Sequence, residues 1–264
     1  MKSNQKNDNA YDARFSEELG GSEYEDLLIA IEYYDEFQKE TGQALQEYIS
    51  AHCQNQAKIK VLEAGPGTGI TTLQLVKADP RVQVVSGDNE PKMLEAVKER
   101  FSKMDGIANR VEFIFSDILE FLKNCEDNSF DAFASVYTLH NFTPDFRRQV
   151  IEEIVKKLKP GGLFVNGDKY AREKDGHLKD YAAEIENYGK FDAPADDAEK
   201  TGDIVRATHL RKIKVEWIAH AAEDEKNKIT VEEQNDMFKR LGMKNIKWGK
   251  RFDLVITVSA TKSS

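Results

Sequence analysis

The sequence predicts an α/β protein with a doubly wound, mostly parallel sheet of seven strands that ends in an antiparallel hairpin. Two observations carry this prediction. From about residue 58, short β-branched segments alternate with segments whose apolar residues recur at helical spacing, as a parallel sheet with crossover helices requires. Near the end of the chain, two strand-like segments follow each other almost directly, which requires an antiparallel hairpin.

Three strands and two helices are expected in the first half of this region. The expected strands are residues 58–63, 82–87 and 111–115. The first helix covers residues 70–77, and the second starts at Pro91, which suits a first helical turn because the missing N–H is not needed there. The apolar stripe of the second helix is Met93, Leu94, Val97, Phe101 and Met104.

The second half supplies the remaining elements. Residues 130–136 are expected as a strand and residues 145–158 as a helix, which Pro160-Gly161-Gly162 then ends. A fifth strand starts at residues 163–166. The last elements are a helix at residues 231–241, stopped by Gly242, and strands at residues 244–248 and 252–259.

We expect residues 1–264 to form a single domain with two additions to its core. The parts are an N-terminal helical cap (1–56), a core (57–170), a charged helical insertion (171–229), and the final helix and hairpin (230–264). The cap is expected as a helix with Leu27, Leu28, Ile31 and Phe37 on one stripe and Tyr33 and Tyr34 beside it.

Composition and charge exclude several classes of protein. The apolar runs are short and interrupted by charge, so we expect no membrane span and a cytoplasmic protein. A net charge of −9 disfavours binding to the phosphate backbone of nucleic acids. Cys53 and Cys125 form no C-x-x-C pair, and the histidines have no partners at ligand spacing, so neither a disulfide nor a metal is expected.

A nucleotide-type site is indicated where the first strand meets the first helix. The glycines of this loop let the backbone turn tightly and approach a ligand closely, and the helix start favours a negative group. Asp88 ends the second strand, where a carboxylate can accept hydrogen bonds from both hydroxyls of a ribose. These features alone fit more than one kind of nucleotide cofactor.

A more specific pattern is Glu63-Ala64-Gly65-Pro66-Gly67-Thr68-Gly69. It resembles the first motif of the class I S-adenosylmethionine-dependent methyltransferases, whose Rossmann-like sheet ends in an antiparallel hairpin. Further matches are the segment from Asp88 to Met93 and Leu94, the strand and loop at residues 130–140, and the Leu-Lys-Pro-Gly-Gly run from Leu158. The resemblance covers about residues 58–168.

This resemblance implies S-adenosylmethionine as cofactor and S-adenosylhomocysteine as product. It implies that Glu63 helps to hold the amino group of the methionine portion, that Gly65 and Gly67 make room for it, and that Asp88 binds the ribose. It places Asp117 at the adenine amino group, although Asp117 could equally be a helix cap. The expected cofactor-binding residues are Glu63, Gly65, Pro66, Gly67, Thr68, Gly69, Asp88, Asn89, Met93, Ser116, Asp117, Ile118, Val136 and Tyr137.

His140 is the candidate catalytic residue, since it lies in the loop that the resemblance places opposite the methyl group. An imidazole there could take a proton from an O–H or N–H nucleophile, or it could be a hydrogen-bonded loop histidine. Methyl transfer can also proceed by positioning alone, without a base. Aromatic candidates to close over the sulfonium are Tyr11, Tyr34, Phe37 and Tyr137, each of which could instead be core.

The preferred hypothesis is a methyltransferase that acts on O, N, S or C of a small molecule bound between the cap and the insertion. The layout is also similar to carboxy-S-adenosylmethionine synthase, a tRNA-modification enzyme, but no counterpart of that enzyme's carboxylate-binding arginine is found. A NAD-dependent oxidoreductase and a non-catalytic cofactor-binding protein are also compatible with a glycine loop on this fold. We expect the charged insertion to act as a lid, with binding of an anionic acceptor and a homodimer contact as the open alternatives, and we expect no nucleic acid or membrane partner.

Overall fold

The computed structural model describes residues 26–31, 33–174 and 177–264. It confirms the predicted sheet, which has seven strands in the order β3-β2-β1-β4-β5-β7-β6. The strands are β1 Ile59–Ala64, β2 Val82–Asp88, β3 Val111–Phe115, β4 Phe130–Val136, β5 Leu158–Lys169, β6 Met243–Trp248 and β7 Val255–Lys262. The first five strands pair in parallel, and β7 runs antiparallel to both β5 and β6, so the expected final hairpin is present.

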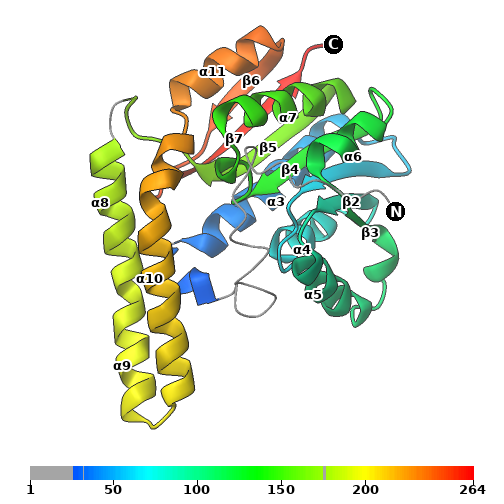
Figure 1. Ribbon diagram of the computed structural model, residues 1–264. Coiled ribbons are helices and arrows are strands. Elements are labelled where there is room, and N and C mark those ends of the chain that lie inside the picture. The colour runs from blue at the N-terminus through cyan, green and yellow to red at the C-terminus, as the bar shows by residue number, and fades with distance from the viewer. Residues whose placement is uncertain (1–25, 32, 175–176) are drawn as a thin grey trace.

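Helices connect the strands and cover the sheet (Figure 1). The α-helices are α3 Tyr34–His52, α4 Ile70–Ala78, α5 Pro91–Ser102, α6 Ile118–Asn124, α7 Pro144–Lys157, α8 His177–Tyr188, α9 Asp192–Lys200, α10 Ile204–Asn227 and α11 Val231–Arg240. The short 3-10 turns are η1 Asp26–Ile29, η2 Ala108–Arg110, η3 Leu139–Asn141 and η4 Gly189–Phe191. No helix in the described ranges is long and apolar enough to cross a membrane.

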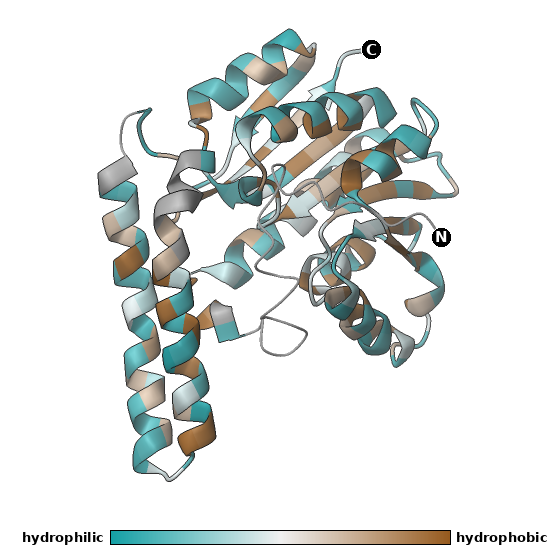
Figure 2. Cartoon of the chain, in the orientation of Figure 1, coloured by the Kyte–Doolittle hydropathy of each residue, from teal (hydrophilic) through white to brown (hydrophobic). Residues whose placement is uncertain are grey.

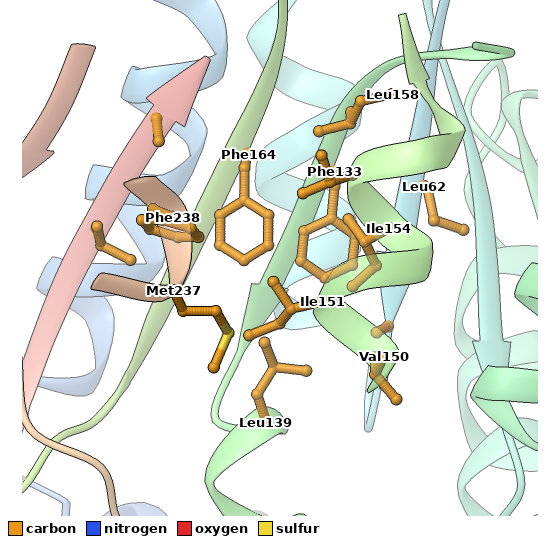
Figure 3. Packing of buried hydrophobic residues seen from close by; sticks show 14 of the residues in the cluster. Leu62, Phe133, Leu139, Val150, Ile151, Ile154, Leu158, Phe164, Met237 and Phe238 are labelled. Atoms are coloured by element: carbon orange, nitrogen blue, oxygen red, sulfur yellow. The ribbon is translucent and has the colours of Figure 1, made fainter. Parts of the chain in front are cut away.

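The side chains of the central strands alternate between the two faces of the sheet, and these strands are buried because helices cover both faces. Leu62, Phe133 and Phe164 point to one face, where they pack against α7 and α11 (Figure 3). Val61 and Val165 point to the other face, where α3 and α4 cover them. In Figure 2 the strands in the middle of the sheet are largely brown, whereas the surrounding helices carry many teal residues.

The insertion folds as a helical hairpin that extends away from the sheet, with α8 and α9 packed against α10 (Figure 1). An apolar seam holds its two arms together. The main buried side chains of this seam are Tyr188, Phe191, Leu210, Ile213 and Trp217. The start of the described chain attaches to the same hairpin, since Asp26 of η1 accepts hydrogen bonds from Arg206 and His209 and Ala30 packs into the seam.

The expectation of one continuous helical stripe in the cap is wrong. η1 ends at Ile29, and Tyr33 has a left-handed backbone (φ 59°) at the N-cap of α3. This break has a packing reason, because Ala30 belongs to the hairpin seam whereas Phe37 packs against Val136 at the end of β4. Tyr11 lies outside the described residues, and so does the side chain of Leu27.

Several boundaries also differ from the sequence prediction, most of them by one residue. Leu158 opens β5 instead of closing the preceding helix, because it pairs with Phe130 across an irregularity in the sheet, and β5 therefore includes Pro160-Gly161-Gly162. The last strand starts at Val255 because residues 252–255 close a tight turn. Met104 follows the end of α5 instead of lying within it.

Candidate functional site

The loop between β1 and α4 turns through three glycines with positive φ. These angles are 66° at Gly65, 53° at Gly67 and 86° at Gly69, in the left-handed region that residues with a Cβ rarely adopt. The Gly65 N–H donates to the carbonyl of Gly87 at 3.0 Å, which ties the loop to the end of β2. The motif found in the sequence is therefore a tight turn at the carboxyl edge of the sheet.

Gly65 and Gly69 are also required by their neighbours. A Cβ on Gly65 would lie 2.4 Å from Oγ1 of Thr138, and a Cβ on Gly69 would lie 2.6 Å from the ring of Phe101. The absence of a side chain at Gly65 thus leaves room for Thr138 in the loop that follows β4. Thr138 was not among the expected site residues, because its proximity to Gly65 follows only from the pairing of β1 with β4.

Glu63 is completely buried beneath this loop. Its Oε2 accepts hydrogen bonds from the hydroxyls of Thr72 at 2.7 Å and Ser86 at 2.8 Å. Its Oε1 is buried without a hydrogen-bond partner in the described part of the chain. Burial raises the pKa of Glu63 to about 7, even though the two hydroxyls favour the charged form. Glu63 therefore retains one buried acceptor that a ligand's donor could satisfy.

Asp88 lies at the end of β2, next to the glycine loop. Its Oδ1 accepts the backbone N–H of Glu90 at 2.9 Å. Burial raises the pKa of Asp88 to about 6, against the backbone N–H groups of Glu90, Gly67 and Asn89, which lower it. Asp88 as a whole residue is partly exposed, so its carboxylate remains a candidate acceptor for ligand hydroxyls.

Asp117 caps helix α6, as one of the two sequence interpretations anticipated. Its Oδ1 accepts the backbone N–H groups of Leu119 at 2.9 Å and Glu120 at 3.1 Å. Ser116 is tied to β2, since its N–H donates to the carbonyl of Asp88 at 3.0 Å. Because both cap bonds end on Oδ1, capping does not by itself exclude a ligand contact through Oδ2.

The remaining expected cofactor residues are mostly buried around these loops. Pro66 and Thr68 are buried within the glycine loop, and Asn89 follows Asp88 in a partly exposed position. The side chains of Met93, Ile118 and Val136 belong to the core, at 3%, 8% and 5% exposure. For these three residues, packing is therefore the contribution that the structure shows directly.

Tyr137 is the centre of an aromatic group at the end of β4. It has a left-handed backbone (φ 58°), and its ring stacks on Phe37 with centroids 5.6 Å apart. Tyr34 meets it edge-on at 6.2 Å, and the ammonium group of Lys169 lies 5.5 Å from its centroid. Three of the four aromatic residues singled out in the sequence are thus brought together.

His140 forms a buried pair with Asp168 at the end of β5. Its Nδ1 lies 2.5 Å from Oδ1 of Asp168, and its backbone N–H donates to Oδ2 at 3.0 Å. Burial alone would raise the pKa of Asp168, but His140 and the guanidinium of Arg147 hold this pKa below its usual value. The carboxylate fixes the ring and favours the tautomer with a proton on Nδ1.

Asp168 was not among the expected site residues. A signal was present, since Asp168 and Lys169 are charged residues that come shortly after the apolar run Leu163-Phe164-Val165 of the expected fifth strand. Buried charges in strands require partners, so this acid could have been marked as a site candidate without knowing its partner. Only the pairing of β4 with β5 identifies that partner as His140.

A second buried charge cluster lies beside Tyr137. Glu184 of α8 accepts hydrogen bonds from Lys169 at 2.7 Å and Lys228 at 2.8 Å. Burial alone would raise the pKa of Glu184, but the two ammonium groups lower it to about 2. A small cavity of about 30 Å³ adjoins this cluster, with Tyr137, Lys169, Glu184 and Tyr188 in its wall.

Comparisons with known proteins agree with this architecture. Residues 61–162 match the sequence model of a methyltransferase domain. A carboxy-S-adenosyl-L-methionine synthase from Nautilia profundicola is 28% identical over 114 residues, which cover 43% of this chain and 46% of the relative. The C-methyltransferase UbiE of ubiquinone and menaquinone biosynthesis from Desulfotalea psychrophila is 34% identical over 112 residues, 40% of this chain and 39% of the relative. The chain thus spans about half the length of these relatives or less.

Among solved structures, the CurJ carbon methyltransferase superposes with a TM-score of 0.58 at 14% identity, over 86% of this chain and 54% of that chain. The DszA carbon methyltransferase superposes with a TM-score of 0.57 at 15% identity, over 86% of this chain and 54% of that chain. At these identities the likeness establishes the fold, which is that of class I methyltransferases. Residues 61–162 are thus similar in sequence to methyltransferase domains, and most of the chain is similar in fold to carbon methyltransferases.

Proposed function

We propose that this protein transfers the methyl group of S-adenosylmethionine to a small-molecule acceptor. The observation that carries this proposal is the set of carboxylates at the carboxyl ends of three neighbouring strands around the glycine loop. Glu63 and Asp88 lie in the last residues of β1 and β2, and Asp117 lies just beyond β3; these three strands are consecutive in the sheet. In open α/β sheets, ligands bind at this edge.

The chemistry of these residues fits the parts of the cofactor. The Asp88 carboxylate can accept from both ribose hydroxyls, and the buried Oε1 of Glu63 requires a donor such as an α-ammonium group. Asp117 can accept from the adenine amino group through the oxygen that does not cap α6. When bound, the cofactor supplies an electrophilic methyl group on a sulfonium, which the Tyr137 aromatic group can stabilise and shield from water.

We further propose that His140 accepts the proton of an O–H or N–H acceptor. Asp168 fixes the ring by accepting from Nδ1, which leaves Nε2 as the basic nitrogen of a neutral imidazole. In this transfer the acceptor's lone pair would form the new bond to the methyl carbon, the carbon–sulfur electrons would return to sulfur, and Nε2 of His140 would take the acceptor's proton. A carbon or thiolate acceptor that is already deprotonated would not need this step.

The small cavity beside Tyr137 is the proposed place for part of the acceptor. It lies between the cap, helix α8 and the turn before β7, where Ala30, Tyr188 and Leu254 contribute to its wall. Because Lys169, Glu184 and Asn187 also line it, we expect an acceptor with polar groups. The helical hairpin would serve as a lid over this region, since it contacts the cap directly.

Titration calorimetry of the purified chain tests the proposal, after any cofactor carried through purification has been stripped. S-adenosylmethionine and S-adenosylhomocysteine should bind and NAD should not. Binding of NAD alone would refute the proposal in favour of an oxidoreductase, and binding of none of the three would refute the assigned cofactor.

Carboxy-S-adenosylmethionine synthesis is a second candidate, favoured by the relatives that carry this name. One of them, from Campylobacter fetus, aligns over 63% of this chain at 26% identity. Mass spectrometry of the nucleoside product separates the two functions. S-adenosylhomocysteine indicates methyl transfer, whereas a cofactor that has gained a carboxyl group indicates the synthase.

A further inference from the structure

Gln38 of helix α3 is a buried amide that the site described above does not use. Its side chain is 1% exposed. Its Oε1 accepts a hydrogen bond from the hydroxyl of Thr71 at 2.7 Å. Its Nε2 has no hydrogen-bond partner within the residues that the structure describes. A buried N–H donor without an acceptor is unfavourable, so this nitrogen requires an explanation.

The position of Gln38 relates it to the proposed cofactor site. Thr71 belongs to the first turn of α4, which begins directly after the glycine loop at Gly69. The residue before Gln38, Phe37, stacks on Tyr137 at the end of β4. Gln38 therefore bonds to the first turn of α4, and its neighbour in the chain packs on the Tyr137 aromatic group.

A second buried atom without a partner lies at the same helix start. Thr72, the neighbour of Thr71, donates to Oε2 of Glu63, and Oε1 of Glu63 has no partner in the described chain. The first turn of α4 thus bonds to two buried residues from other elements. One is Gln38, which has an unused donor, and the other is Glu63, which has an unused acceptor. An α-amino acid group supplies the complements of both, because its carboxylate accepts and its ammonium donates.

We propose that Gln38 donates a hydrogen bond through Nε2 to the α-carboxylate of the methionine portion of the cofactor, while Glu63 accepts from the ammonium group. This inference rests on the proposed function and adds a residue from outside the family's sequence motifs. It makes Gln38 a residue that selects for ligands bearing the carboxylate. A purely structural link between α3 and α4 would need only Oε1, which already bonds Thr71.

Two substitutions and two ligands test this assignment by calorimetry. Gln38→Met keeps the length of the side chain and removes the amide. Gln38→Glu keeps an acceptor for Thr71 and replaces the donor with a carboxylate. The ligands are S-adenosylhomocysteine and S-adenosyl-3-thiopropylamine, which lacks only the α-carboxylate.

The matched control is Gln234→Met. Gln234 is equally buried at 1% exposure, and its Nε2 also lacks a partner in the described chain. It lies on α11, which packs on β6 at the edge of the sheet away from β1. The control should leave the affinity for both ligands unchanged, and thermal unfolding of each variant reports whether it is folded.

Gln38→Met should weaken the binding of S-adenosylhomocysteine roughly 10- to 100-fold, as expected for the loss of one hydrogen bond to a charged group. It should leave the decarboxylated ligand nearly unaffected. Gln38→Glu should weaken the binding of S-adenosylhomocysteine further, because the two carboxylates repel each other. The same variant should bind the decarboxylated ammonium ligand at least as tightly as the wild type does. This reversal between the two ligands is not expected from a loss of packing.

Equal weakening of both ligands would overturn the assignment and indicate a structural role for Gln38. Unchanged affinity for S-adenosylhomocysteine in both Gln38 variants would also overturn it, while the wild type's own binding would leave the proposed function standing. If the wild type bound no S-adenosylhomocysteine, the proposed function would fail and the role of Gln38 would fail with it.

Discussion

Replacement of Asp168 by asparagine should strongly destabilise the protein. Asp168 is 2% exposed, and each of its oxygens receives two hydrogen bonds. Oδ1 accepts from Nδ1 of His140 and the backbone N–H of Lys169, and Oδ2 accepts from the backbone N–H of His140 and Nδ2 of Asn166. Asp168→Asn preserves the shape but turns one of these oxygens into an NH₂ group that faces two donors.

The magnitude follows from the number of donors that lose their acceptor. A buried donor left unsatisfied costs about 1–3 kcal/mol, so two of them cost about 2–6 kcal/mol. The His140 ring can change tautomer and accept from the new amide, which favours the lower half of this range. We expect a loss of about 2–4 kcal/mol in the free energy of unfolding, or roughly 4–10 °C in Tm for a chain of this size.

Urea denaturation followed by tryptophan fluorescence measures this loss. The pKa of Asp168 is lowered in the folded state, so its stabilisation is present above the unfolded value of about 3.9 and is lost as the pH falls through the folded value. The difference between wild type and variant should therefore be present at pH 6–8 and shrink in acid. Asp145→Asn is the control, since Asp145 is 86% exposed in its ion pair with Arg148 and should contribute little. A loss below about 0.5 kcal/mol for Asp168→Asn would refute the reasoning.

Four further predictions concern the site. Asp88→Ala should weaken S-adenosylhomocysteine by about 1.5–3 kcal/mol per lost hydrogen bond in calorimetry, and unchanged affinity in a folded variant would show that Asp88 is misassigned. Gly65→Ala should destabilise the protein by about 1–3 kcal/mol in thermal unfolding, because its Cβ meets Thr138. Gly161→Ala has a positive φ but no atom within 4 Å of its Cβ, so it should cost less, and equal losses would remove the role assigned to Thr138. Glu63→Gln should stabilise the cofactor-free protein at pH 8 by on the order of 1–3 kcal/mol, because the raised pKa of Glu63 makes its ionised form unfavourable there. This gain in the free energy of unfolding should disappear below about pH 4.5. A gain of the same size at both pH values would contradict the prediction. His140→Asn should lower kcat while the cofactor affinity measured by calorimetry is retained, and an unchanged kcat and pH profile would show that His140 is not the proton acceptor.

Local patterns predicted the elements well wherever one period dominates. The strands expected at residues 111–115 and 130–136 agree with β3 and β4 residue for residue, and Pro91 begins α5 as expected. The prediction failed where apolar residues that are close in the sequence pack against different parts of the protein. Residues 27–37 fit a single helical stripe, but Ala30 and Phe37 pack against different parts of the protein, and the chain breaks at Tyr33 to reach both.

Spacing along the chain was enough to predict the alternation of strands and helices, the glycine loop with its acids, and the final hairpin. Which distant side chains meet depends instead on how these elements pack. His140 and Asp168 are 28 residues apart, and Gln38 and Thr71 are 33 apart. Their contacts depend on the pairing of β4 with β5 and on the packing of α3 over α4, and no local pattern encodes either arrangement. The burial of Glu63 has the same origin, since its environment is built from α4 and β2 and not from its own strand.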